Sequence, residues 1–393
     1  MNQPPVYLNH LGLICAMGNN PETIRHKLFN NGERCLTTTD QFTPGRALPV
    51  GAVNDPLPDL SSFPVTEQTR TNQLMAAALE QIQPALEQAK ENIDPLRIGI
   101  VLGTSTSGIA EGEAAISDHL KHQSMPDTFD YQQQEMANPA TTLARWLDVL
   151  GPAYVVSTAC SSGAKALASA RRLLRMGVCD LVIAGGVDSL GKLTVNGFSA
   201  LESVSEQPCN PFSRNRNGIN IGEGAALFIV SRDKGPVCLS GVGEGSDAHH
   251  ISAPHPDGLG AERVMATALA NANLTASEIG YLNLHGTATP QNDKMESRAV
   301  ARVLGIETPC SSTKSHTGHT LGAAGAIEAA FCWLTLTDPE HRIPLQAWDG
   351  EVDDELSNIR LVDQPLKHKI TAAMSNSFAF GGNNISLVLE RAL

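Results

Sequence analysis

The chain has 393 residues, of which 41% are hydrophobic and 18% charged, so it is long enough to bury a large core. Its formal net charge of −13 argues against nucleic acid as a partner, because nucleic-acid binding needs a basic face. No run of residues approaches the length of a membrane span, and the N-terminus lacks a basic region before an apolar segment, so we expect a cytoplasmic protein. Eight cysteines without paired spacing suit a reducing compartment.

Cys160 follows a predicted strand and precedes a predicted helix. Ala153–Val156 has the β-branched and aromatic character of a buried strand, and Ala164–Ala170 consists largely of strong helix formers. A helix N-terminus carries roughly half a positive charge, which would bring a thiol with a free pKa of about 8.5 to roughly half ionised at pH 7. This placement predicts a nucleophile, and the alternative is a small buried hydrophobic residue.

A polar break follows the strand-like run Ala226–Val230. The break, Ser231–Pro236, predicts a boundary between an N-terminal half, residues 1–235, and a C-terminal half, residues 236–393. We expect the two halves to be similar, because a sequence pattern in the first half recurs in the second.

In that repeated pattern, Ser157–Gly163 precedes one alanine-rich helix, and Ser312–Gly318 precedes another. Helices so poor in polar residues are expected to be buried on all sides, between sheets.

Two segments deliver histidines from predicted strand ends. In Tyr281–Thr289, His285 enters a glycine turn with two hydroxyls behind it. In Lys314–Gly325, His319 precedes a predicted helix, and His316 with His319 could also be interpreted as a metal-binding pair. We predict no metal, because no cysteine pair has ligand spacing and no acidic residue is placed to complete a set.

Together these segments closely resemble the β-ketoacyl-[acyl-carrier-protein] synthases, the decarboxylating condensing enzymes of the thiolase superfamily. The resemblance spans nearly the whole chain, and it implies an α/β fold of five layers, αβαβα, with two similar halves and no cofactor. Seven segments carry it in the family's order: Ser157–Gly163, Ala184–Asp188, Asn210–Ser213, Gly222–Ala225, Tyr281–Thr289, Lys314–Gly325 and Ser375–Asn384.

The resemblance assigns the nucleophile to Cys160, which would take an acyl chain from a carrier thioester. A malonyl thioester would then lose carbon dioxide, and negative charge would develop on its thioester oxygen. His285 and His319 would stabilise that oxygen as neutral N–H donors.

Other residues take binding roles in the same resemblance. The backbone N–H groups of the nucleophile and of Phe380 would bind the oxyanion of the acyl-cysteine. Gly381 and Gly382 would let the backbone approach the substrate closely. Thr287 and Thr289 would contact the malonyl group.

Four charged residues are expected around these groups. Lys314 would order the second histidine, with Glu328 as its acidic partner, although a solvated lysine is the alternative. Asp293 and Glu296 would shape the site, although acids also favour the exposed first turn of a helix.

The chain departs from the family's usual pattern at several positions. Ala379, Asn383 and Ser213 stand where the family usually has Gly, Thr and Asp, and none of these changes removes a catalytic group. Tyr131–Pro139 aligns with a stretch that often lines the acyl pocket at the dimer interface. Its polarity argues against an ordinary saturated primer and allows an aromatic, unsaturated or polyketide-like one.

The expected partners are an acyl carrier protein and a second subunit, either an identical copy or a homologous chain-length factor. Because carrier proteins are acidic, docking would need a basic patch, although a solvated face is the simpler interpretation of each candidate. The candidates are Arg70, Lys121, Arg171, Arg172, Arg175, Arg214 and Arg216.

Three other protein classes share features with this sequence. A coenzyme A thiolase normally has a second catalytic cysteine near the C-terminus, and Met374–Asn384 contains none. A non-catalytic chain-length factor normally lacks the nucleophile that Cys160 supplies. An initiating synthase that uses coenzyme A primers typically pairs histidine with asparagine, whereas this chain offers two histidines.

Overall fold

The computed structural model describes residues 4–30 and 32–392, and a ten-stranded sheet runs through them. The N-terminal part of the sheet has the order β5 (Ala153–Val156), β4 (Ile98–Gly103), β6 (Leu181–Asp188), β7 (Gly224–Ser231) and β1 (Tyr7–Cys15). The C-terminal part continues with β8 (Val237–Ser246), β12 (Asn383–Arg391), β11 (Ala372–Phe378), β9 (Ile279–Asn283) and β10 (Cys310–Ser311). A short antiparallel pairing between β1 and β8 joins the two parts.

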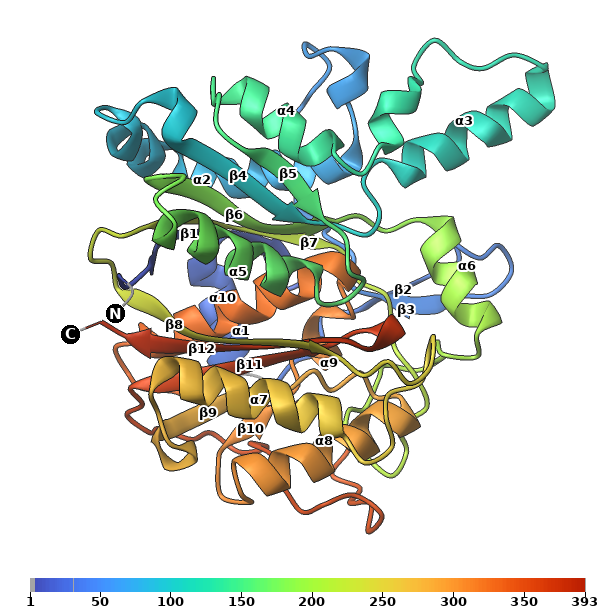
Figure 1. Ribbon diagram of the computed structural model, residues 1–393. Coiled ribbons are helices and arrows are strands. Elements are labelled where there is room, and N and C mark those ends of the chain that lie inside the picture. Colours follow the sequence, from blue (N-terminus) through green and yellow to red (C-terminus); the bar gives the residue numbers. More distant parts are fainter. Residues whose placement is uncertain (1–3, 31, 393) are drawn as a thin grey trace.

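Helices cover both parts of the sheet and fill the space between them (Figure 1). The N-terminal outer layer contains α2 (Arg70–Lys90) and α4 (Asn138–Trp146), and the C-terminal outer layer contains α7 (Leu259–Ala272) and α8 (Pro290–Val303). The central layer holds α1 (Pro21–Asn30), α5 (Ser162–Arg175) and α10 (Ala324–Leu336). The predicted five-layered α/β fold is therefore confirmed.

The remaining elements lie around this frame. They are β2 (Thr37–Thr39), β3 (Leu48–Val50), α3 (Ile109–His122), α6 (Lys192–Ala200), α9 (Lys314–Thr317) and short 3₁₀ turns at Val65–Glu67, Pro95–Arg97, Tyr131–Gln134, Ala276–Glu278, Leu321–Ala323 and Phe380–Gly382. Among the described residues, no helix is both long and apolar enough to cross a bilayer.

The strands, and the connection between the two predicted halves of the chain, lie where the sequence pattern places them. The two predicted strands are present as β5 and β7. The prediction that Ala153–Val156 is buried is wrong, because β5 lies at the edge of the sheet and is only partly covered. Every residue of β6 and β7 is buried. Such continuous burial fits strands that are covered by helices on both faces. β7 ends at Ser231 and β8 begins at Val237, so the proposed division between the halves falls in this connection.

The two central helices approach each other closely because small residues line their contact. A Cβ on Gly163 would lie 2.7 Å from the backbone nitrogen of Ala326, so only glycine fits at this point of α5. α10 is buried along almost its whole length, as predicted, whereas the last turn of α5 reaches solvent at Arg172. This close contact places the N-terminal ends of both helices in the middle of the molecule (Figure 1).

We predict that Gly163→Ala lowers the free energy of unfolding by about 1–2 kcal/mol. The substitution improves intrinsic helix propensity by up to about 1 kcal/mol, but overpacking typically costs about 1–3 kcal/mol, and here the added carbon meets backbone. Urea unfolding measures the change. The matched control is Gly197→Ala in α6, where nothing lies within 4 Å of the new Cβ and stability should not fall. Equal stability of Gly163→Ala and the wild type would contradict the tight helix contact.

Candidate active site

The turn that carries Cys160 is held by local hydroxyl groups between β5 and α5. The Ser162 hydroxyl accepts a hydrogen bond from the backbone N–H of Thr158 and donates one to the carbonyl of Ala159. Ala159 adopts the left-handed conformation, with a φ of 53°, so the chain turns sharply just before the cysteine. The serine-rich sequence around Cys160 therefore fixes the direction of its side chain.

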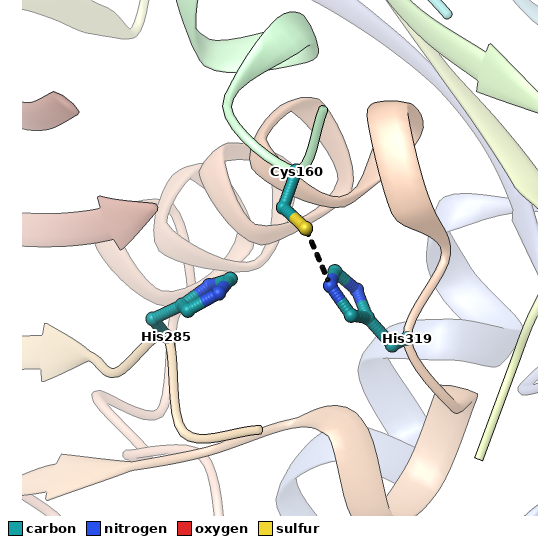
Figure 2. A group of neighbouring side chains, drawn as sticks. All are labelled: Cys160, His285 and His319. Carbon is teal, nitrogen blue, oxygen red and sulfur yellow. Dashed lines mark hydrogen bonds between the residues drawn. The ribbon is translucent and has the colours of Figure 1, made fainter. Parts of the chain in front are cut away.

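His319 lies directly opposite the cysteine. Its Nε2 is 2.9 Å from Cys160 Sγ, and both residues are buried (Figure 2). The backbone N–H of His319 donates to the carbonyl of Asn220, which anchors the histidine segment against the loop before β7. A thiol and an imidazole nitrogen at this distance can share one proton.

The protonation of this pair differs from the sequence-based expectation. Burial raises the pKa of the Cys160 thiol to about 11, although the Lys314 charge and the backbone N–H of Phe380 both act to lower it. Burial, together with Lys314, holds the pKa of His319 well below its usual range. The expected half-ionised thiol is therefore wrong, because loss of solvation outweighs the helix N-terminus. The pair rests as a neutral thiol that donates to the neutral imidazole.

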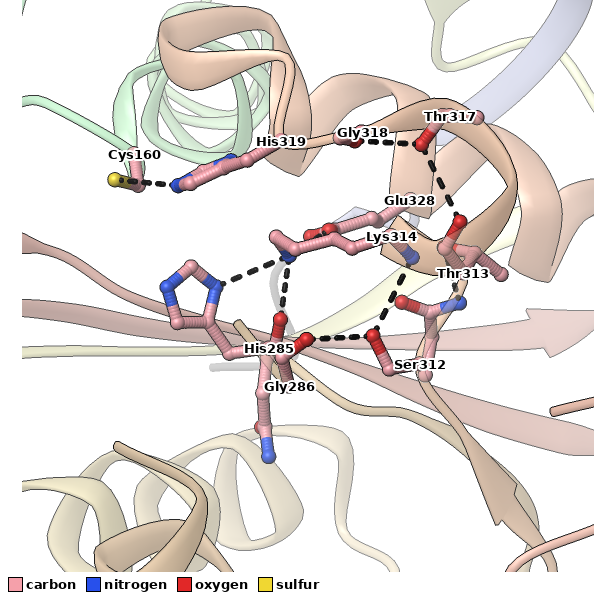
Figure 3. A network of polar contacts seen from close by, with 12 residues as sticks. Cys160, His285, Gly286, Ser312, Thr313, Lys314, Thr317, Gly318, His319 and Glu328 are labelled. Carbon is pink, nitrogen blue, oxygen red and sulfur yellow. Dashed lines mark hydrogen bonds and ion pairs between the residues drawn. The ribbon is translucent and has the colours of Figure 1, made fainter. Parts of the chain in front are cut away.

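His285 approaches the same point from the end of β9. Its ring and that of His319 lie edge to face, with 5.5 Å between their centroids. Lys314 Nζ lies 3.4 Å from His285 Nδ1 (Figure 3). Since a lysine ammonium only donates, Nδ1 must accept, and the proton of the neutral ring must be on Nε2. His285 is therefore fixed as an N–H donor.

Lys314 is buried and serves the first histidine rather than the second. Its ammonium forms an ion pair with Glu328 on α10 and donates to the backbone carbonyl of His285. The sequence predicted that Lys314 orders His319, and no hydrogen bond of that kind links them among the described residues. Burial raises the pKa of Glu328 to about 7, although Lys314 acts to lower it.

These groups suit an anion better than a metal ion. Cys160 Sγ and one ring nitrogen from each of His285 and His319 lie within 4.8 Å of one another, a spacing that could hold a metal. However, the Lys314 contact puts a cation beside His285 and keeps a proton on the nitrogen that would have to bind the metal. His316 lies outside this group, because its ring nitrogens contact the backbone carbonyls of Glu33 and Leu345.

A glycine turn next to the cysteine brings backbone N–H groups to the sulfur. The backbone N–H groups of Phe380 and of Cys160 itself both act on the thiolate and lower its pKa. Gly381 and Gly382 have φ values of 79° and 75°, a left-handed conformation that favours glycine. The arrangement can therefore present two N–H donors to an oxyanion formed on a group attached to Cys160.

Two family models match this chain over most of its length. They are the Beta-ketoacyl synthase N-terminal domain, at residues 14–235, and the Beta-ketoacyl synthase C-terminal domain, at residues 237–343. The chain belongs to the β-ketoacyl synthase family. The predicted family and the predicted enzyme class, an acyltransferase, are thereby confirmed.

Individual relatives cover the same range. The 3-oxoacyl-[acyl-carrier-protein] synthase 2 of Rhizobium meliloti (strain 1021) is 34% identical over 339 residues, which is 81% of this chain and 79% of the relative. The enzyme of the same name from Staphylococcus aureus (strain COL) is 32% identical over 341 residues, 82% of this chain and 81% of the relative. A chain of the solved complex between the ketosynthase ApeO and its chain length factor ApeC from Xenorhabdus doucetiae is 42% identical, with a TM-score of 0.94 and coverage of 99% of this chain and 98% of that chain.

Two buried carboxylates shape the loop that carries His285 in this β-ketoacyl synthase. Glu296 accepts hydrogen bonds from the backbone N–H groups of His285 and Gly286, and Asp293 accepts from those of Phe212 and Ala288. Both acids are fully buried, so the alternative of exposed first-turn positions on α8 is wrong. Burial raises the pKa of Glu296 to about 7 and that of Asp293 to about 6.

A cavity of about 370 Å³ opens onto the catalytic residues of the ketosynthase. Thr287 and Thr289 line it, and their hydroxyls are 2.9 Å apart. Phe198 on α6 also lines it and packs against Phe380, with 5.7 Å between the ring centroids. The sequence analysis missed Phe198, because only tertiary packing brings α6 to the cavity.

The polar segment before α4 does not line this cavity within the chain. Gln133 is buried, and its side-chain amide donates to the carbonyl of Gln68 and accepts from the backbone N–H of Asp130. Gln132 is exposed. Gln133 therefore holds a local turn within this chain. A contribution of the segment to an acyl pocket at a dimer interface stays a prediction.

We predict that the alkylation rate of Cys160 by iodoacetamide keeps rising above pH 9. The thiolate is the reacting form, and burial raises the pKa of this thiol to about 11, so the thiolate fraction still increases there. Mass spectrometry of the Cys160 peptide measures the rate. The urea-unfolded chain is the control, because its thiol should titrate near a pKa of about 8.5. A plateau below pH 8 in the folded protein would show that the helix N-terminus outweighs burial.

Proposed function

We propose that this chain is a β-ketoacyl-[acyl-carrier-protein] synthase that transfers an acyl group to Cys160 and condenses it with a malonyl unit. The observation that carries the proposal is the meeting of Cys160 Sγ with His319 Nε2, beside an N–H donor fixed on His285. Both curated relatives bear the name of this activity.

In the first half-reaction, the Cys160 sulfur attacks the carbonyl carbon of the carrier thioester. The thiol proton moves to Nε2 of His319 and then to the sulfur of the departing carrier, so a new C–S bond replaces the old one and no charge accumulates. The backbone N–H groups of Cys160 and Phe380 stabilise the tetrahedral oxyanion.

In the second half-reaction, a malonyl thioester occupies the cavity. Its C–C bond to the carboxylate breaks, carbon dioxide leaves, and the electron pair becomes an enolate whose oxygen accepts from Nε2–H of His285. The acylated sulfur no longer carries a proton, so His319 Nε2 can hold one and donate to the same oxygen. The enolate carbon then attacks the acyl-cysteine, and a new C–C bond replaces the C–S bond. The Cys160 thiolate leaves with the negative charge that the malonyl carboxylate brought in, and it takes up a proton from solvent.

The substrate-binding roles of the cavity residues rest on their position. The hydroxyls of Thr287 and Thr289 lie on the cavity wall that carries His285, where the malonyl group must bind. Gly381 and Gly382 are not among the residues that line the cavity, and a Cβ on Gly382 would lie 2.9 Å from the Cβ of Asp247, so these glycines support the turn that carries the Phe380 N–H. None of these roles needs a bound cofactor.

The proposed partners are an acyl carrier protein and a homologous chain-length factor. A chain of the complex between the ketosynthase ApeO and its chain length factor is 42% identical, and the curated synthases are less similar, which favours a polyketide-type or polyene-type pathway. The chain leaves the edge strand β5 partly exposed, and the segment between α3 and α4 carries further exposed apolar side chains, Met125, Tyr131 and Met136. A second subunit would bury them; a homodimer is the alternative.

Most basic residues considered for carrier docking are already paired. Arg70, Arg172, Arg214 and Arg216 form ion pairs with acidic residues. Arg171 is buried, so it is removed from the surface. The eight cysteines are all free, which supports a reducing compartment and the expected cytoplasmic location.

Three variants test the proposed chemistry through separate half-reactions. Cys160→Ala should lose acyl transfer and condensation but keep malonyl decarboxylation. His285→Ala should still be acylated, with decarboxylation reduced about 10²- to 10³-fold because one donor is lost. His319→Ala should lose both half-reactions, acylation by about 10²- to 10⁴-fold, because Nε2 accepts the thiol proton. Mass spectrometry of acylated protein and release of labelled carbon dioxide measure the two steps.

The half-reactions that each variant loses or keeps distinguish the roles of the two histidines. Thr335→Ala, at a buried position on α10 outside the cavity, serves as a control for general damage to the fold. Condensation by Cys160→Ala would overturn the assignment of the nucleophile. Full acylation of His319→Ala would remove its role as the proton acceptor.

A further prediction concerns the second subunit. Met136→Asp should abolish copurification with a homologous subunit, because burying an unpaired charge costs several kcal/mol. Met176→Asp, at an exposed position after α5, is the matched control and should leave the complex intact. Light scattering measures the assembly. A homodimer that elongates acyl carriers at full rate alone would rule out an obligatory partner.

A further inference from the structure

Asp188 is a buried carboxylate that the proposed chemistry does not use. It is the last residue of β6, it is completely buried, and it belongs to the segment Ala184–Asp188, to which the resemblance gave no role. Among the described residues, no lysine or arginine forms an ion pair with it. A buried charge without a cation must be stabilised by hydrogen bonds, so the donors around Asp188 define what it holds.

Those donors come from both halves of the chain. One carboxylate oxygen, Oδ1, accepts from the hydroxyl groups of Thr104 and Thr106 and from the backbone N–H groups of Ser105 and Thr106. The other oxygen, Oδ2, accepts from the backbone N–H of Gly322, in the 3₁₀ turn that precedes α10. Asp188 thus ties the loop after β4 to the turn that follows His319.

The turn after His319 has little freedom at this point. Leu321 adopts the left-handed conformation, with a φ of 50°. A Cβ on Gly322 would lie 2.7 Å from the backbone nitrogen of Ser105 and 2.8 Å from Asp188 Oδ2. The Gly322 N–H is therefore pressed against the carboxylate, and removing this acceptor frees the turn.

The ring of His285 has a hydrogen-bond contact of its own at Nδ1, whereas the position of the His319 ring depends on its backbone alone at that nitrogen. Lys314 holds the His285 ring through Nδ1, but the buried Nδ1 of His319 has no hydrogen-bond partner among the described residues. The separation between His319 Nε2 and Cys160 Sγ is thus set by the turn that Asn220 holds at one end and Asp188 at the other.

We propose that Asp188 is a positioning residue for His319, which keeps Nε2 at hydrogen-bond distance from Cys160 by fixing the Gly322 N–H. It does not touch the reacting atoms. This inference rests on the proposed role of His319 as the acceptor of the thiol proton.

A double-mutant cycle on Cys160 alkylation tests the inference. The variants are Asp188→Asn, His319→Ala and the double variant, and the readout is the rate of iodoacetamide modification of Cys160 at neutral pH. Each single variant should slow alkylation about tenfold, because the thiol loses its aligned proton acceptor. The double variant should be no slower than His319→Ala, because effects that act through one residue are not additive.

Several outcomes would overturn the proposal. They are a wild-type rate in Asp188→Asn, an unchanged rate in His319→Ala, or an additional slowing by Asp188→Asn when His319 is already alanine. Asp338→Asn is the matched control, since Asp338 is also fully buried but pairs with Arg25 and Arg342. In this variant, Cys160 should be alkylated at the wild-type rate even if the unfolding temperature of the protein falls.

A second variant keeps the proposal testable in case the first variant does not fold. If Asp188→Asn does not fold, Thr104→Val removes one donor to Oδ1 while keeping the carboxylate, and the same cycle has the same outcomes. Alkylation needs no acyl or malonyl substrate. A non-additive cycle in a protein that fails to condense would therefore overturn the proposed function but leave the positioning role of Asp188 supported.

Discussion

The close packing of α5 against α10 sets the geometry of the catalytic residues. Cys160 lies just before α5 and His319 just before the turn that leads into α10, and the small residues Gly163 and Ala326 let the helices approach. The nucleophile belongs to one half of the chain and its proton acceptor to the other. A bulkier helix contact would move the two residues apart without changing either, so the chemistry depends on core packing far more than on the local turns.

The electrostatics give the two histidines different tasks. The charge of Lys314 is balanced by Glu328, and the ammonium fixes the His285 tautomer through Nδ1. His319 lacks such a contact among the described residues, so its Nε2 can accept a proton in one step and donate it in the next. A fixed donor and an adaptable acceptor can therefore serve two successive half-reactions in one cavity.

The sequence predicted the fold and the residues that meet, but not how they interact. Cys160 and His285 follow the ends of β5 and β9 as predicted, whereas His319 follows the short helix α9 and not a strand end. All three lie within recognisable local patterns, and local patterns are readable from sequence. The partner of Lys314 and the pKa of Cys160 depend on contacts and burial that only the assembled core creates. The same holds for the Gln133 amide, which donates to the carbonyl of Gln68, a residue distant in sequence.

In the proposed mechanism, the resting contact between Cys160 and His319 also orders the two half-reactions. While the sulfur carries its proton, Nε2 of His319 accepts a hydrogen bond from the thiol and cannot donate one. Only His285 can then donate to a malonyl thioester oxygen. Acylation removes that proton from the sulfur and frees Nε2 to hold one, so the second donor becomes available only when an acyl group awaits attack. Because each such donor is worth about 10²- to 10³-fold in rate, decarboxylation without an acyl acceptor is disfavoured by the same margin. The cysteine thus limits wasteful loss of malonyl groups before it acts as the nucleophile.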